Sequence, residues 1–310
     1  RASAMGARIL EGVRAHDVLR DARGRVGGVR VQATRPDPAQ PLLGVHTCGA
    51  RVVVAADGGA AGIARLSGIA PRARTTRRLV YRMHLSGVGG VGASRALHLF
   101  ADGCCEVVTS RDGGATLTLV VPGQVTGAAT LDAEAYLDGW LASHPRVSAC
   151  LGAARRHGAR RVEGPVSAHS THAPRSWAPG IALVGDAAHG AAAIGGDGLH
   201  TALHGGVTLG SYLFEALRAP SPVRADHALE AYERSRRHAF SARWRTDALV
   251  SAALTSPALF ARAARSFEQR PAMTDLIGGA LDGLVPARMM VRPGVLWQLF
   301  GPPPGRQGFA

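Results

Sequence analysis

The stretch from Ala182 to Gly206 reads ALVGDAAHGAAAIGGDGLHTALHGG, and it decides the fold that we expect. The apolar run from Ile181 to Val184 predicts a short buried strand, which Gly185-Asp186 ends. The glycine-rich turn Gly195-Gly196-Asp197-Gly198 then leads into a helical pattern from Leu199 onward. A strand, an acidic turn, small residues and a helix N-terminus in this order predict the floor of a pocket.

The chemistry of this turn suits a ligand that carries hydroxyl and electron-rich groups. Glycine has no Cβ, so its backbone admits close approach by a ligand. The carboxylate of Asp186, at the end of the strand, can accept hydrogen bonds from sugar-type hydroxyls. The unpaired N–H groups at the start of the helix attract an electron-rich or anionic group. An ordinary strand–loop–helix crossover that is rich in glycine is the alternative.

These residues resemble the second flavin motif of the FAD-dependent oxidoreductases of the aromatic-hydroxylase superfamily, the p-hydroxybenzoate hydroxylase-like flavoenzymes. That motif runs G-D-A-A-H, then a spacer, then G-x-G. Here it reads Gly185-Asp186-Ala187-Ala188-His189, with Gly196-Asp197-Gly198 at the expected distance. In the family the aspartate holds a ribitol hydroxyl of FAD, and the helix start faces N1 and O2 of the isoalloxazine ring. The resemblance therefore implies FAD as the cofactor.

A second strand and turn precede this motif. The run Arg51–Ala56 predicts a buried strand that ends at Asp57-Gly58, a pair that is also common in ordinary turns. In the family a D-G signature leads to a helix ending in L-x-G-I, and here Leu66-Ser67-Gly68-Ile69 follows. Ala61 and Ala64 stand where the family commonly has serine and arginine. The resemblance thus leaves NADPH or NADH as a candidate electron donor. The two alanines imply fewer polar groups on the chain to contact that nucleotide.

Taken together, the two motifs assign twelve residues to the binding of FAD. They are Asp57, Gly58, Gly185, Asp186, Ala187, Ala188, His189, Gly195, Gly196, Asp197, Gly198 and Leu199.

We expect a mixed α/β fold with an incomplete FAD-binding Rossmann-like domain, an inserted antiparallel β-sheet substrate domain and C-terminal helices. The expected boundaries are 1–74 with 160–222 for the FAD-binding domain, 75–159 for the substrate-binding sheet and 223–310 for the helical region. The chain begins RASAMGARILEG, without the G-x-G-x-x-G unit that would hold the FAD pyrophosphate. We therefore expect that a preceding segment carries this unit and that the chain alone holds FAD weakly.

Alternating apolar and polar residues predict the sheets. Arg8–Val18 and Arg25–Ala33 indicate a hairpin closed at Asp21–Gly24. An antiparallel sheet is predicted from Arg78–Ser86, Ala96–Ala101, Glu106–Ser110 and Ala115–Val121. Gly87–Gly92 fits G-x-G-x-x-G as written, but too few residues follow it for a dinucleotide-fold helix, so it predicts a hairpin loop.

The helices follow from apolar spacing and capping residues. Asp132–Leu151 is predicted helical, capped by Asp132 and broken at His144-Pro145, and Arg160–His172 is predicted extended. Further helices are predicted at Gly196–Leu217, Asp226–Val250, Ser256–Phe267 and Ala272–Leu284, followed by an apolar tail at Met289–Phe300 and an unstructured GPPPGRQGFA. We expect the last helices to cover the substrate side, with a peripheral membrane contact as the alternative.

Composition excludes several classes of function. With 310 residues and 46% hydrophobic content, the chain can bury a large core in one or two domains. The formal net charge of +14 comes from 36 basic residues, all of them arginine, a bias typical of a GC-rich genome. Aromatic residues make up 5% and do not interleave with the arginines, so nucleic acid is not expected as a partner.

Four cysteines at positions 48, 104, 105 and 150 form no metal or disulfide pattern and indicate reduced thiols in the cytoplasm. No signal peptide is recognisable, and the longest uncharged run, Leu199–Phe214, is too short for a membrane span.

The resemblance implies a flavin monooxygenase that hydroxylates an aromatic or other hydrophobic small molecule through a flavin hydroperoxide. His189 favours this branch, whereas Ala202-Leu203-His204-Gly205-Gly206 is similar to the geranylgeranyl-reductase-like branch, which reduces prenyl double bonds. A non-enzymatic basic scaffold with a decayed flavin fold is a third alternative. His169 and His172 are candidates for the substrate side, and His189 and His200 for the flavin side. No catalytic residue and no metal site is assigned, because no such cluster follows from spacing.

Overall fold

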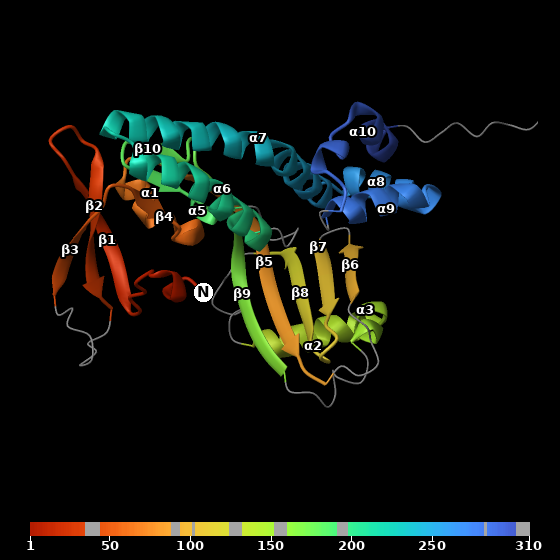
Figure 1. The fold of residues 1–310 in the computed structure, drawn as a ribbon. Helices are drawn as coiled ribbons and strands as arrows, with labels where there is room; N and C mark the ends of the chain where they lie inside the picture. Colours follow the sequence, from red (N-terminus) through yellow and green to blue (C-terminus); the bar gives the residue numbers. More distant parts are fainter. Residues whose placement is uncertain are drawn as a thin grey trace, which may run out of the picture. The chain divides into compact units, whose positions relative to one another are not determined.

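The computed structural model describes residues 1–34, 44–87, 94–100, 103–123, 132–151, 160–190, 198–281 and 284–301 (Figure 1). These residues form two compact units. The first unit comprises the described parts of Arg1–Ala73, together with Thr171–Gly190 and Gly198–Phe240. The second comprises the described parts of Arg74–Ser170 and Ser241–Ala310. Each unit has its own core, so each is described separately.

The first unit contains a three-stranded antiparallel sheet built on the predicted hairpin. Its strands are β1 (Val13–Arg20), β2 (Val26–Ala33) and β3 (Val45–Gly49). Asp21 closes the turn between β1 and β2, since its Oδ1 accepts hydrogen bonds from the amides of Arg23 and Arg25 at 2.8 and 2.9 Å. The hairpin is therefore confirmed, although β1 begins at Val13 rather than at Arg8.

A second sheet in this unit contains the strand that leads into Gly185-Asp186. Its order is β10 (Trp177–Ala178), β11 (Ile181–Leu183) and β4 (Val53–Ala55), and β11 pairs with β4 in parallel. Ile181 and Leu183 pack into the core shared with β1 and β2, whereas Ala182 packs against helices on the opposite face. A parallel strand buried on both faces requires a continuous apolar run, which explains the sequence of this strand.

The remaining elements of the first unit are helical. They are η1 (Ser3–Met5), η2 (Gly58–Ala60), α1 (Gly62–Leu66), α5 (Asp186–His189), α6 (Gly198–Arg218) and α7 (Pro222–Thr255), of which α7 continues into the second unit. Tyr232 of α7 is fully buried, and its hydroxyl donates a hydrogen bond of 3.0 Å to the carbonyl of Leu183. This bond fixes α7 to β11, the strand that leads into the flavin-like motif.

The second unit is built on a five-stranded sheet in the order β6 (Ser94–Phe100), β7 (Gly103–Thr109), β8 (Ala115–Pro122), β5 (Arg72–Leu85) and β9 (Arg160–His172). The pairs β6–β7, β7–β8 and β8–β5 are antiparallel, which confirms the sheet that the alternating pattern predicts. The proposed loop at Gly87–Gly92 lies, from residue 88 onward, outside the described residues.

Alternate residues of these strands face two different layers. Leu117 and Leu119 of β8 pack against α2 (Ala133–Ser143) and α3 (Pro145–Cys150), which cover one face of the sheet. Val121 belongs to the same cluster as these leucines, whereas Val120 belongs to a smaller cluster on the opposite face. Asp132 caps α2 as predicted, because its Oδ1 accepts a hydrogen bond from the amide of Ala135 at 2.8 Å.

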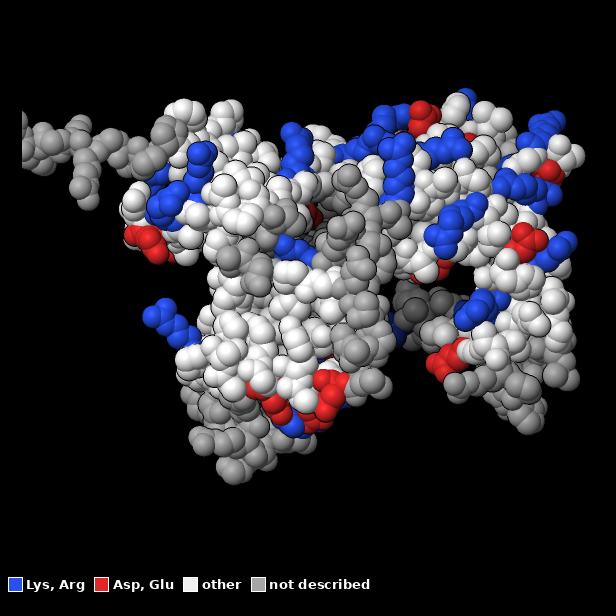
Figure 2. Space-filling model, turned by 180° about the vertical axis from the view of Figure 1, so that it is seen from behind, with Lys and Arg blue, Asp and Glu red and all other residues white. Residues whose placement is uncertain are grey.

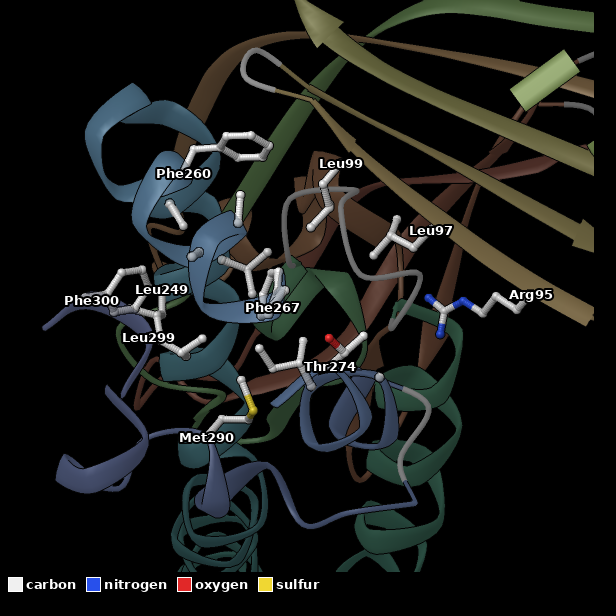
Figure 3. Close-up of a pocket in the computed structure, with 16 residues that line it drawn as sticks. Arg95, Leu97, Leu99, Leu249, Phe260, Phe267, Thr274, Met290, Leu299 and Phe300 are labelled. Carbon is white, nitrogen blue, oxygen red and sulfur yellow. The ribbon is translucent and has the colours of Figure 1, made fainter. Parts of the chain in front are cut away.

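The C-terminal helices belong to this second unit. They are α8 (Pro257–Gln269), α9 (Pro271–Leu281), η3 (Ala287–Met289) and α10 (Pro293–Phe300). Proline stands at the first position of α8, α9 and α10, where its missing N–H costs no helical hydrogen bond. Phe260, Phe267 and Leu299 from these helices surround one space together with β6 (Figure 3). The predicted unstructured tail, from residue 302 onward, lies outside the described residues.

The arginines of the surface are dispersed. On the face shown in Figure 2, basic side chains are interspersed with acidic side chains and uncharged surface. Along α7, Arg234 pairs with Glu230 at 3.2 Å one turn away, and Arg237 pairs with Glu233. Among the helices in the described ranges, none combines the length and apolar character needed to cross a bilayer.

The bond between Tyr232 and Leu183 gives a test of the packing of α7. Tyr232→Phe removes the hydroxyl and leaves a buried carbonyl without this donor, so we expect a loss of about 1–2 kcal/mol in the free energy of unfolding. Denaturant titration followed by circular dichroism measures it. Tyr212→Phe, at a half-buried tyrosine of α6 whose ring lies 6.2 Å from that of Tyr232, is the matched control. Equal losses in both variants would contradict the assignment.

Candidate functional site

The turn after β11 depends on a backbone conformation that only glycine adopts readily. Gly185 has φ +60° and ψ −145°, and a Cβ at this position would lie 3.4 Å from the Cβ of Ala202 in α6. The carbonyl of Gly185 accepts hydrogen bonds from the amides of Ala188 and His189, both at 3.0 Å. The turn therefore directs the chain straight from β11 into α5, close beneath α6.

Asp186 lies beside the first residue of α6. A Cβ built on Gly198 would be 3.8 Å from Oδ1 of Asp186, so the carboxylate and the helix start occupy the same side of the unit. Asp186 is exposed as a residue, and the partial desolvation of its carboxyl by the neighbouring chain raises the pKa of this group from the ordinary value. An exposed carboxylate next to the unpaired N–H groups of a 21-residue helix can accept hydrogen bonds from a ligand that also reaches those groups.

Two residues that sequence reasoning missed hold this turn in place. Thr171, at the end of β9, is buried and donates a hydrogen bond of 2.7 Å from Oγ1 to the carbonyl of Asp186. The same Oγ1 accepts a hydrogen bond of 2.9 Å from the amide of Gly190. A Cβ at Gly190 would lie 2.7 Å from that oxygen and 3.3 Å from Asp186, so only glycine fits. The glycine directly after G-D-A-A-H was the available sequence signal.

The turn after β4 lies next to the turn after β11. A Cβ at Gly59 would be 3.8 Å from Cγ2 of Thr171, the residue that braces Asp186. Asp57 uses Oδ2 to accept a hydrogen bond of 2.9 Å from the amide of Ile63, and this bond closes the loop that contains Gly58, whose φ is +70°. Because β4 and β11 are parallel, both turns stand at the carboxyl edge of one sheet, where open α/β sheets bind ligands.

His189 forms a pair with His172 across this edge. Their Nδ1 atoms are 3.0 Å apart and their rings cross at 85° with centroids 5.2 Å apart. Burial, together with the charges of His172 and Arg236, lowers the pKa of His189 to about 4. Burial and the charges of Arg236 and Arg237 also lower the pKa of His172. Both imidazoles are therefore neutral near pH 7, and one Nδ1 donates to the other.

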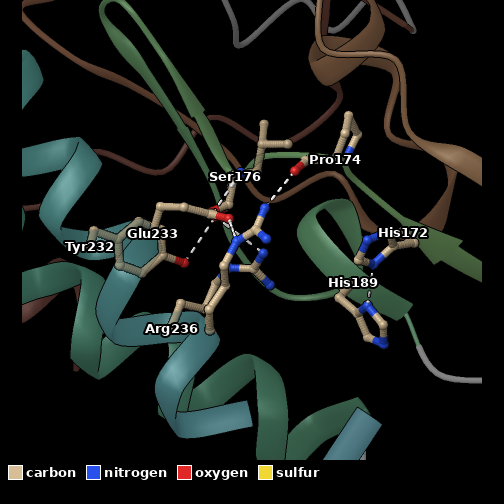
Figure 4. Close-up of polar contacts among 9 residues, drawn as sticks. His172, Pro174, Ser176, His189, Tyr232, Glu233 and Arg236 are labelled. Atoms are coloured by element: carbon tan, nitrogen blue, oxygen red, sulfur yellow. Dashed lines mark hydrogen bonds and ion pairs between the residues drawn. The ribbon is translucent and has the colours of Figure 1, made fainter. Parts of the chain in front are cut away.

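An ionic cluster of Glu233, Arg236 and Arg237 on α7 lies beside the two histidines (Figure 4). Burial alone would raise the pKa of Glu233, but hydrogen bonds from Ser176 and Arg237 and the charge of Arg236 outweigh it, and the pKa is lowered. The amide of Ser176 donates to Oε2 of Glu233 at 2.8 Å, and Arg237 donates to the carbonyl of Pro174 at 2.6 Å. The cluster thus ties α7 to the segment that leads into β10, and its positive charge adds to the effect of burial in lowering the pKa of both histidines.

The twelve residues assigned to FAD from the sequence fall into three groups. Asp57, Gly58, Gly185, Asp186, His189, Gly198 and Leu199 lie around the two adjacent turns and the start of α6. Ala187 and Ala188 belong to the same turn, but their side chains are buried in the core. Gly195, Gly196 and Asp197 lie outside the described residues.

The histidine candidates also separate. His200 is exposed on α6, where its ring stacks on that of His204 at 6.1 Å. The backbone of His169 belongs to β9, and its side chain lies outside the description. Within the described ranges, no three His, Cys, Asp or Glu side chains converge closely enough to hold a metal ion.

Comparison with known proteins identifies the fold. No protein-family model matches the chain, and no curated protein matches its sequence. Among solved structures, the flavin-dependent brominase Bmp2 is similar with a TM-score of 0.62 and 17% identity, over 87% of this chain and 64% of the brominase. The chain has the fold of the FAD-dependent oxidoreductases. This confirms the mixed α/β class and, at the level of the fold, the resemblance seen in the motifs.

Two other solved structures are also similar in fold. PqsL, a probable FAD-dependent monooxygenase from Pseudomonas aeruginosa, gives a TM-score of 0.57 and 23% identity over 79% of this chain and 64% of PqsL. A geranylgeranyl bacteriochlorophyll reductase-like protein from Thermoplasma acidophilum gives a TM-score of 0.64 and 17% identity, over 96% of this chain and 71% of that protein. The chain therefore spans about two thirds of the length of these oxidoreductases.

The conformation of Gly185 predicts the effect of a single methyl group. Gly185→Ala places a Cβ in a region of φ and ψ that non-glycine residues avoid, so we expect a loss of about 1–3 kcal/mol in the free energy of unfolding. Denaturant titration measures this loss. Gly206→Ala, in the interior of α6 with open space around the new Cβ, is the control and should stabilise the chain by up to about 1 kcal/mol. If Gly185→Ala left the free energy of unfolding unchanged, the turn would not be constrained to the conformation of glycine.

The low pKa of His189 makes stability depend on pH. The pKa is about 4 in the folded chain and 6.5 ordinarily, so the unfolded chain binds a proton first as the pH falls. Stability is therefore full above pH 6.5 and declines between about pH 6.5 and 4, by up to about 3 kcal/mol. His189→Gln should flatten this decline in denaturation measured from pH 4 to 7. The control is His238→Gln, at an exposed histidine of α7, and an unchanged slope in His189→Gln would refute the assignment.

Proposed function

We propose that this chain forms part of an FAD-dependent oxidoreductase that acts on a hydrophobic small molecule. The observation that carries the proposal is the juxtaposition of Asp186 with the first residue of α6, at the carboxyl edge of the parallel pair β4–β11. This edge also contains the Asp57–Gly58 turn. The fold shared with flavin-dependent proteins supports the same cofactor.

The residues at this edge fit the chemistry of FAD. Asp186 presents an exposed carboxylate that would accept a hydrogen bond from a ribitol hydroxyl. The first N–H groups of α6, at Gly198 and Leu199, would face the electron-rich edge of the isoalloxazine ring. Gly58, where an added Cβ would meet nothing within 4 Å, exposes bare backbone beside the same site. A flat ring and a polyol can therefore approach the main chain closely.

When bound, FAD supplies the two-electron redox chemistry, and the protein supplies position, polarity and exclusion of water. Asp186 would orient the cofactor, and Thr171 holds the backbone of Asp186 in place. His189, half-buried and neutral, can hold or release a proton at an imidazole nitrogen while its Nδ1 contacts His172 at 3.0 Å. These roles position the cofactor and assign no catalytic residue.

We further propose that the reaction is a monooxygenation, with NADPH or NADH as electron donor. The G-D-A-A-H sequence with its histidine favours this branch, and the fold similarity to PqsL is in line with it. Reduction of prenyl double bonds is the second candidate, which the similarity to the geranylgeranyl bacteriochlorophyll reductase-like protein favours. Oxygen consumption coupled to a hydroxylated product distinguishes the first from the second, in which a double bond is lost without oxygen uptake.

The proposal is tested by titrating FAD into the chain and following the quenching of flavin fluorescence. We expect weak, saturable binding by the 310-residue chain. Asp186→Ala should weaken it by about tenfold, the equivalent of one hydrogen bond to a charged group. Asp275→Ala, at an exposed aspartate of α9, is the matched control.

Two outcomes would overturn the proposal. Equal affinities of the parent chain and of Asp186→Ala for FAD would show that FAD does not bind at the turn after β11. A complete lack of saturable binding, with the chain shown to be folded by circular dichroism, would favour the non-enzymatic scaffold.

A further inference from the structure

The second unit contains an apolar cavity of about 550 Å³ that the flavin motifs do not explain. Leu97 and Leu99 line it from β6, where alternate residues point to the same face. The opposite walls come from α8, α9, α10 and the end of α7, with Phe260, Phe267 and Ile277 among the lining residues (Figure 3). All sixteen lining residues belong to the second unit, so the cavity is complete within it.

The volume of the cavity is that of a ligand site rather than of a packing defect. Protein interiors are packed as densely as organic crystals, and voids larger than a few water molecules are few. Sites for small organic ligands commonly measure about 300–1,000 Å³ and are lined mainly by hydrophobic side chains. The lining here is aliphatic and aromatic apart from Arg95, Thr274 and Gly278, and an apolar lining favours apolar ligands.

The charge at the cavity is already balanced. Arg95 lies at one end of the group of lining residues, and its Nε donates to Oε1 of Glu106 at 2.5 Å (Figure 3). The neighbouring carboxylate repels an anionic ligand that approaches the guanidinium, and the apolar walls disfavour any charged group. Thr274 contributes a hydroxyl, which can donate to or accept from a neutral polar group. Among the lining residues, the chemistry therefore favours a neutral ligand over an ionised one.

We propose that this cavity binds a neutral hydrocarbon-chain molecule, such as a long-chain alcohol, independently of flavin. The chain fills the space between β6 and the C-terminal helices, and Thr274 meets its polar end. β6 belongs to the sheet that the sequence assigns to substrate binding, so this inference adds a ligand class to the proposed function, but binding requires residues of the second unit alone and no redox step.

The test uses N-phenyl-1-naphthylamine, a neutral dye whose fluorescence rises in apolar sites, with the full chain at pH 8. We expect saturable binding and displacement by decan-1-ol. Decanoate, which has the same chain length but a charge, should displace the dye at least tenfold less effectively. Equal or better displacement by decanoate, or a lack of saturable dye binding, would overturn the proposal.

A matched pair of glycine variants locates the binding. Gly278 lines the cavity on α9, and a Cβ added there meets nothing within 4 Å, so the first carbon of a Gly278→Leu side chain has room and the rest reduces the volume of the cavity. We expect it to weaken dye binding at least tenfold. Gly139→Leu makes the same change at an exposed position of α2, where a Cβ also meets nothing within 4 Å, and should leave the affinity within twofold.

A second blocking variant covers the case in which Gly278→Leu does not fold. Ala253→Phe narrows the cavity from α7, a different wall, and should weaken dye binding at least tenfold. Circular dichroism verifies that each variant is folded. Parent-like binding by a folded Gly278→Leu or Ala253→Phe variant would place the dye elsewhere and refute the cavity as its site.

Discussion

The parallel pairing of β4 with β11 is the constraint on which the candidate site depends. Ile181 to Leu183 lie in register with Val53 to Ala55, so the turns that follow the two strands open at the same edge. Each turn then needs glycine, because Gly58 has a positive φ and Gly185 has φ +60° with ψ −145°. Without the pairing, Asp57 and Asp186 would belong to unrelated loops, and no common edge would be available to a ligand.

Buried polar contacts from α7 hold the strand that leads to this edge in place. Tyr232, Glu233 and Arg236 lie within one turn or so of α7, and each is buried. Tyr232 donates to the carbonyl of Leu183, and Glu233 accepts from the amide of Ser176, so α7 is tied both to β11 and to the residue that precedes β10. Removing one partner from such a cluster costs several kcal/mol, since a buried charge is left uncompensated. Burial, together with the charge of Arg236 in this cluster, lowers the pKa of both His172 and His189 and keeps the pair neutral.

Local patterns in the sequence predicted the elements and the turn chemistry. The Asp21 turn, the Asp132 cap and the alternation along β8 are decided by residues close in the chain, and all three are found in the structure. The order of strand, acidic turn and helix around Asp186 was predictable for the same reason.

Contacts between distant residues were beyond such patterns. Thr171 and His172 meet Asp186 and His189 only because β9 returns beside α5, and the pairing of strands is not encoded in spacing. The short strand β3 was missed, since its sequence VHTCG is mostly exposed and has no apolar period. The cavity needed walls from five separate elements, so no single stretch of sequence could indicate it.

The two sites differ in the physical basis of recognition, and this difference bears on selectivity. At the carboxyl edge of β4 and β11, recognition rests on directional hydrogen bonds from one carboxylate and from fixed backbone groups, which reject molecules of the wrong shape. In the cavity it rests on apolar burial, worth about 25 cal/mol per Å² and without direction. Thr274 is the one uncharged polar side chain among the lining residues. The cavity should therefore select ligands by size and charge rather than by the shape of the hydrocarbon skeleton. Because its walls are apolar, we expect it to bind a broad range of apolar ligands.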